Sequence, residues 1–252
     1  MSQKKHGDSL HETTVLGHVA RYRLTVLEAA AGVVRPRGLA RRVLARLVES
    51  GLLACAPLYR NRRYWHLTQS GATRLGTALD DSGEPLFGPL SEAAKIRAYA
   101  MLAFCCLGDI SRDRLTRREL QRHFADLDRP GLPLNYYVDG SRPKPQLGFL
   151  RVDTGGHGRW DRIVEKVRHD AESHWLMPGF RRLITAGCFE ITLVAALAEK
   201  AERIRRALAE GRIARPVQVR VVAMPDLVHL VMPAALPVAV QPANQPLRPR
   251  RF

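Results

Sequence analysis

The sequence lacks the features by which several classes of protein are recognised. Its cysteines form no Cys-x-x-Cys pair, which excludes the usual zinc-binding and disulfide frameworks: Cys55, Cys105, Cys106 and Cys188. Isolated cysteines of this kind are typical of small buried side chains in a reducing compartment. The N-terminus has no apolar signal-peptide segment, and no run of 18 apolar residues occurs anywhere. These absences predict a cytoplasmic protein that has no membrane partner.

Acidic residues are scarce relative to basic ones. The 252 residues include 40 Lys and Arg against 24 Asp and Glu, which gives a net charge of +16. Such an excess predicts a polyanionic partner, nucleic acid before membrane. Because 46% of the residues are hydrophobic, the chain can still bury a core. Its length predicts one large domain or two small ones.

Changes in composition divide the chain into parts. After a polar leader over residues 1–12, residues 13–78 form a basic module. A stretch rich in Gly, Pro, Asp and Ser predicts a linker over 79–90. Residues 91–232 alternate helical and strand patterns. Five prolines beyond Met232 predict an extended or disordered tail over 233–252.

The basic module begins with three helical patterns. Apolar residues recur at helical spacing in "TTVLGHVARYRLTV", "TVLEAAAGV" and "RPRGLARRVLARLVESGLL". In the third, one face carries Leu39, Val43, Leu44, Leu47 and Val48, and the arginines project from the other side. "LLACAPLYRNRRYWHLT" then predicts a strand, a tight turn at Arg60-Asn61-Arg62-Arg63 and a second strand. Three helices followed by a basic hairpin resemble the winged helix-turn-helix class.

That resemblance implies binding to double-stranded DNA. A helix of this kind fits the major groove, and an arginine fork meets two acceptors of guanine together. The hairpin would lie along the backbone or enter the minor groove. The candidate DNA-binding residues are Arg35, Arg37, Arg41, Arg42, Arg46, Arg60, Asn61, Arg62 and Arg63. Two alternatives stay open: a solvated charged helix face, and a winged helix that mediates only protein contacts.

Beyond the linker the patterns indicate helix, strand, strand, helix, strand, helix, strand, with a further short helix before the first strand. "FEITLVAA" is a nearly continuous apolar run, which suits a central strand covered on both faces. Thr116 and Glu119 have the spacing of a capping box at the start of the short helix. This order predicts an α+β protein whose second domain has a mixed sheet flanked by helices.

The motifs of the second domain also resemble those of a known family. The order of "VDG", "FLRVDTG", a helix with a lysine and "ITLVAALAEKAERIRRAL" is similar to the replication-relaxation family. Members are winged-helix proteins of plasmids and integrative elements, and their second domain looks like a divergent PD-(D/E)xK nuclease fold. The resemblance implies a role in replication, conjugative transfer or regulation of a mobile element, with a relaxase or another transfer or replication protein as partner.

A PD-(D/E)xK nuclease needs two carboxylates for Mg²⁺ and a lysine beside the attacking water. Asp139 and Asp153 are the candidate acids, and Lys166 on the following helix is the candidate lysine. The position two residues after Asp153 is a glycine, where the family pattern has the lysine. We therefore expect a non-catalytic domain without a metal or cofactor, with a Mg²⁺-dependent nuclease as the alternative. We also expect the two aspartates to lie too far apart for one ion or to be engaged by arginine.

Other candidate sites are weaker. His169 and His174 have a poor spacing for a metal and are expected to be partly exposed. "TGGHG" lacks the Lys-Ser/Thr of a phosphate-binding loop. Tyr136 and Tyr137 have the residue type that stacks on bases, although aromatic residues in strands usually belong to the core. The oligomeric state stays open, a homodimer being one option.

Overall fold

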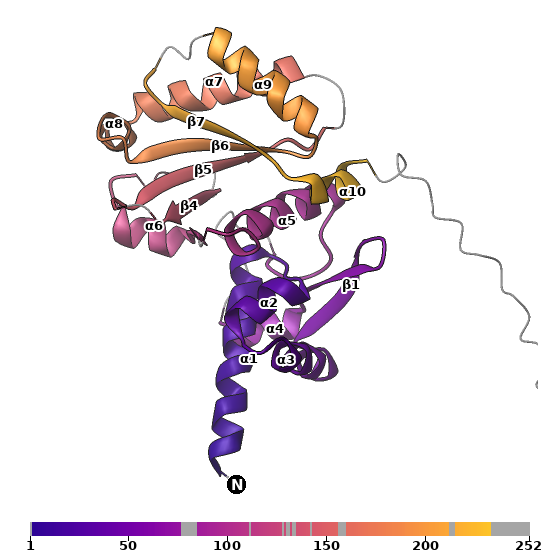
Figure 1. The fold of residues 1–252 in the computed structure, drawn as a ribbon. Coiled ribbons are helices and arrows are strands. Elements are labelled where there is room, and N and C mark those ends of the chain that lie inside the picture. The colour runs from indigo at the N-terminus through magenta and orange to yellow at the C-terminus, as the bar shows by residue number, and fades with distance from the viewer. Residues whose placement is uncertain are drawn as a thin grey trace, which may run out of the picture.

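Figure 1 shows the fold. The computed structural model describes residues 2–76, 85–110, 112–127, 129, 132, 135–141, 143–155, 160–211 and 215–232, with side chains from residue 9 onward. The tail predicted for 233–252 and part of the predicted linker lie outside the described residues. Helices and strands together make a mixed α+β architecture, which confirms the predicted class.

The first part of the chain is a set of helices around a hairpin. Its elements are α1 (Ser2–Tyr22), α2 (Leu27–Val33), α3 (Arg37–Glu49), β1 (Leu53–Tyr59), β2 (Arg62–Leu67) and α4 (Gln69–Arg74). The polar leader predicted for residues 1–12 is continuous with the first helix of the module, because α1 runs without a break from Ser2. No proline interrupts this segment, so the backbone hydrogen bonds of the helix continue through it. In Figure 1 the N-terminal half of α1 extends beyond α3.

The second part is built on a five-stranded sheet. Its elements are α5 (Glu92–Cys106), β3 (Arg112–Arg114), α6 (Arg117–His123), β4 (Tyr136–Asp139), β5 (Gln146–Val152), α7 (Trp160–Leu176), α8 (Pro178–Thr185), β6 (Phe189–Ala195), α9 (Ala198–Glu210), β7 (Gln218–Ala223), η1 (Pro225–Leu227) and α10 (Val228–Val231). The strand order is β3-β4-β5-β6-β7. The pairs β3–β4 and β4–β5 are antiparallel, and β5–β6 and β6–β7 are parallel. The predicted mixed sheet is confirmed.

Helices cover both faces of this sheet. One face packs against α6, α7, α8 and α9 through a cluster that includes Phe149, Phe180 and Ile191. The other face packs against α5, to which β4 and β6 contribute Tyr137 and Val194. Figure 1 shows α7 and α9 on one side of the strands and α5 on the other. All seven residues of β6 are buried, as the apolar run predicted.

The cluster around α5 also takes in side chains from the first part of the chain. Tyr22 of α1, Leu58 of β1 and Tyr64 of β2 belong to it. Within the predicted linker, Leu86 is buried and Gly88 donates its N–H to the Leu67 carbonyl. The two parts therefore share a hydrophobic core. Among the described helices, none is both long and apolar enough to cross a membrane.

Candidate functional site

The third helix presents a basic face opposite its buried one. Pro36 precedes the first turn with extended backbone, and the helix begins at Arg37. Its buried side chains are Ala40, Val43, Leu44 and Leu47. Arg37, Arg41, Arg42 and Arg46 are exposed, as predicted. The first turn itself contains no acidic residue, the residue type that favours the positive end of the helix dipole.

The hairpin tip carries a second group of basic residues. Arg60 and Asn61 form a two-residue turn, and Arg60 has a left-handed φ of 49°. The prediction of a four-residue turn is wrong, because Arg62 and Arg63 belong to β2. Successive strand residues point to opposite faces, so these two arginines diverge. Arg60, Asn61 and Arg63 are exposed, and Arg62 is half-buried.

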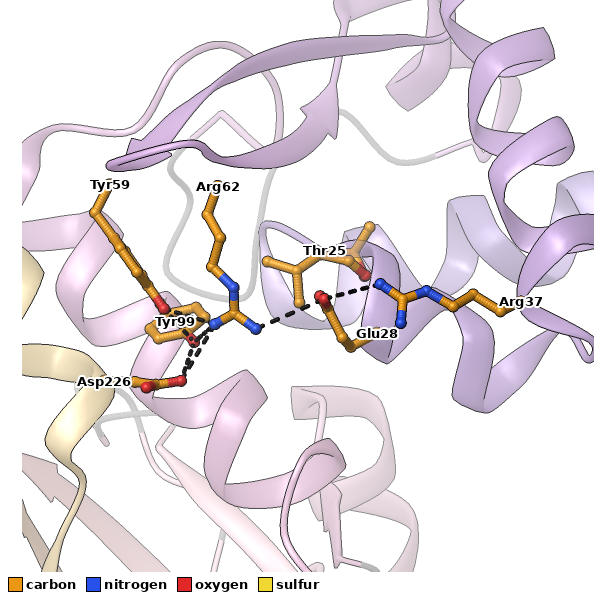
Figure 2. A network of polar contacts seen from close by, with 8 residues as sticks. Thr25, Glu28, Arg37, Tyr59, Arg62, Tyr99 and Asp226 are labelled. Carbon is orange, nitrogen blue, oxygen red and sulfur yellow. Dashed lines mark hydrogen bonds and ion pairs between the residues drawn. The ribbon is translucent and has the colours of Figure 1, made fainter. Parts of the chain in front are cut away.

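Arg62 is engaged by other side chains of the protein. Its Nη1 donates to Tyr59 Oη at 2.6 Å, to Tyr99 Oη at 2.9 Å and to Asp226 Oδ2 at 3.2 Å. Its Nη2 lies 3.6 Å from Glu28 Oε1. Arg37 approaches the same Glu28 oxygen at 3.3 Å. Figure 2 shows Glu28 between the two guanidinium groups, so the first turn of α3 and the start of β2 lie close together.

The remaining candidate residues differ in whether other groups of the protein contact their side chains. Nη1 of Arg46 lies 3.3 Å from Oε1 of Glu12, and both side chains are partly exposed. Arg35, Arg41, Arg42, Arg60 and Arg63 make no hydrogen bond or ion pair within the described part of the chain. These five guanidinium groups are therefore available to an anionic partner.

The candidate nuclease residues are not brought together. Asp139 is 1% exposed, and Arg112 of β3 donates to its Oδ2 at 3.1 Å. Burial opposes ionisation of this carboxyl, but hydrogen bonds from Ser141 and the ion pair with Arg112 outweigh it and lower its pKa. Asp139 pairs in register with Gln146 at the start of β5, whereas Asp153 follows the end of that strand. With seven residues in β5, about 3.3 Å each, the two carboxylates lie roughly 20 Å apart.

Asp153 also has its own cation. Lys200 Nζ of α9 lies 2.7 Å from Asp153 Oδ2, and both side chains are buried. On the same sheet face Arg151 pairs with Asp170 of α7. Lys166 is exposed on α7. In the described ranges, no group of three or more His, Cys, Asp or Glu side chains is placed to hold a metal.

The aromatic and histidine candidates belong to the core. Tyr136 and Tyr137 are 1% and 0% exposed. The prediction of a partly exposed His174 is wrong: it is buried between Tyr136 Oη at 2.8 Å and the Asp170 carbonyl at 2.6 Å. Burial lowers its pKa. Position 174 falls on the apolar stripe with Ile163, Val167 and Ala171, which is the sequence signal for a buried side chain.

Comparisons with known protein families, with curated proteins and with solved structures found no match for this chain.

Proposed function

We propose that this protein binds double-stranded DNA as a winged helix-turn-helix protein, with α3 in the major groove and the β1–β2 hairpin on the adjacent backbone. One observation carries the proposal: Glu28 joins Arg37, in the first turn of α3, to Arg62 at the start of β2, so the N-terminal end of that helix and the basic hairpin lie close together. Arg41 and Arg42 would read base edges, and Arg60 and Arg63 would contact phosphates. Arg62 is not part of the proposed contact surface.

The second domain would be a non-catalytic, nuclease-like scaffold. Its carboxylates Asp139 and Asp153 are separated by the length of β5, and each is paired with a basic side chain. The sequence resemblance to the replication-relaxation family supports a role in a mobile genetic element. Two roles fit that resemblance: an accessory factor at an origin of transfer or replication, and a transcription regulator. Footprinting on the DNA of the element that encodes the protein would separate them, since one predicts a site at an origin and the other a site at a promoter.

Duplex binding is tested by fluorescence anisotropy at several salt concentrations. Replacing Arg37, Arg41 and Arg42 with alanine should reduce sequence preference, by about 1–3 kcal/mol for each base-reading arginine removed. Replacing Arg60 and Arg63 should weaken binding to all sequences and flatten its salt dependence. The matched control replaces Arg118, Arg122 and Arg203, three arginines that are exposed in the second part of the chain. If this control weakens binding as much as the α3 variant does, net charge and not the winged helix determines the affinity.

A further inference from the structure

Arg62 connects its own hairpin to three elements that are distant in the sequence. Its guanidinium group contacts Tyr59 of β1, Tyr99 of α5, Asp226 of η1 and Glu28 of α2. In Figure 2 these partners surround the guanidinium group from both sides, and Asp226 comes from the far end of the described chain. A side chain held by this many directional contacts has few alternative rotamers.

Two tyrosines of the network, Tyr59 and Tyr99, link the hairpin to α5. Tyr99 is fully buried, and burial raises its pKa well above the ordinary range, so its phenol stays protonated. It donates to Asp226 Oδ2 at 3.2 Å and accepts from Arg62. The rings of Tyr59 and Tyr99 meet edge to face with their centroids 5.9 Å apart. An aromatic contact and hydrogen bonds therefore join the hairpin to α5 at the same place.

Apolar packing holds the same face of the hairpin. Leu58 and Tyr64 belong to the cluster around α5, together with Leu227 and Leu230 of the C-terminal turns. Tyr59 also contacts the ring of His229, with centroids 5.0 Å apart. This face of the hairpin is therefore docked on the second part of the chain, and Arg63 points from the opposite face.

We propose that Arg62 is a positioning residue, which fixes the angle of the hairpin relative to α3 by anchoring it to α5 and η1. The proposal rests on the proposed binding of DNA. Through Glu28, the same anchor reaches Arg37 in the first turn of α3. Arg62 thus orients the side chains that contact DNA without contacting a phosphate itself.

Neighbouring residues supply the test, because Arg62 and Arg63 carry the same charge and differ in their surroundings. Anisotropy titrations at several salt concentrations compare Arg62→Ala, Arg63→Ala and Asp226→Asn with the parent. Arg63→Ala should lower the slope of log K against log [salt] by about one phosphate contact. Arg62→Ala should keep the parental slope and weaken binding to the preferred duplex by about tenfold, the effect of removing charge-assisted hydrogen bonds.

Asp226→Asn separates positioning from net charge. Removing an acid from a DNA-binding protein should tighten binding if only net charge matters. If Arg62 acts by positioning, Asp226→Asn should weaken binding in the same direction as Arg62→Ala, and Tyr99→Phe should do so to a smaller extent. A flattened slope for Arg62→Ala, together with tighter binding by Asp226→Asn, would overturn the proposal and make Arg62 a direct phosphate contact.

Hydrogen exchange without DNA separates this proposal from the proposed function. The amides of β1 and β2 should exchange faster in Asp226→Asn and Tyr99→Phe than in the parent, while those of β6 keep the parental rate. Parental exchange rates in the hairpin of both variants would overturn the positioning role even if the protein binds duplex DNA. Faster exchange in a protein that binds no duplex would retain the anchor and reject the proposed function.

Discussion

Asp153 and Lys200 form a buried ion pair in which Oδ2 and Nζ are 2.7 Å apart and the side chains are 8% and 5% exposed. The pair joins the end of β5 to the first turn of α9. Asp153 also accepts the Gly155 N–H, and Lys200 donates to the Gly155 carbonyl. The charge of Asp153, one of the two candidate metal-binding carboxylates of the sequence, is therefore balanced by a lysine of the same chain.

This pairing predicts that the protein does not cut DNA. With Mg²⁺ or Mn²⁺ present, linear, supercoiled and single-stranded substrates should remain intact in gel assays over hours. A divalent ion would have to displace the Lys200 ammonium and would find Asp139 at the far end of β5. Metal-dependent nicking that disappears in Asp153→Ala would contradict this prediction and support the nuclease alternative.

The same pair should matter for stability. Lys200→Met leaves the Asp153 carboxylate buried without its ammonium partner, which typically costs about 3–5 kcal/mol in the free energy of unfolding. Asp153→Asn together with Lys200→Met removes both charges and should recover part of that stability. Urea unfolding of the two variants and the parent measures both effects. Asp153→Asn alone completes the double-mutant cycle, and a loss in the double variant equal to the sum of the two single losses would show that the charges are not coupled.

Gly148 should tolerate no side chain. A Cβ added there would lie 2.0 Å from Tyr137 Cζ, and Tyr137 is fully buried against β5. Gly148→Ala should therefore reduce stability by about 1–3 kcal/mol or more, and adding Tyr137→Leu should restore part of it. Gly17 in α1 is the matched control, since a Cβ there meets nothing within 4 Å. Gly17→Ala should be neutral or stabilise the helix by up to about 1 kcal/mol in thermal unfolding.

His18 makes stability depend on pH. Burial, reinforced by the nearby charge of Arg21, lowers the pKa of this histidine from 6.5 to about 4. Below about pH 6.5 the unfolded chain binds a proton that the folded chain does not bind. Stability should therefore fall as the pH decreases from about 6.5 to about 4, by at most about 3 kcal/mol. His18→Leu should reduce this dependence in urea unfolding at about pH 7 and about pH 5; His174, whose pKa is also lowered, keeps a residual slope. An unchanged slope would exclude His18 as a cause.

Local patterns in the sequence predicted most of the elements. The helical spacing of α3, the run that forms β6 and the capping box of Thr116 and Glu119 are all present. Several elements were missed, β3 and α8 among them. The strand β3 is only three residues long and polar, and α8 follows α7 after a single residue, so neither has a separate periodic signal.

Interactions between distant residues were harder to predict. Arg62 and Asp226 are 164 positions apart, and no local pattern distinguishes Arg62 from Arg63 before β2 is placed on α5. The separation of Asp139 and Asp153 could be predicted from the sequence. Asp139 ends the first strand of an antiparallel pair and Asp153 follows the second, and the C-terminal ends of two antiparallel strands lie at opposite ends of the sheet. No pattern in the sequence indicated that Lys200 would pair with Asp153, because Lys200 lies in α9, well beyond Asp153 in the sequence.

The shared core limits how the chain can be divided, because α5 packs in one cluster with Tyr22, Leu58 and Tyr64 of the first part. A fragment that ends before α5 would carry these side chains on an uncovered surface, and a fragment that begins at α5 would uncover the opposite side of that helix. Exposed apolar patches of this kind promote aggregation. Fragments cut at the change in composition around residues 77–90 would therefore be poor substitutes for the whole chain in crystallisation or binding assays.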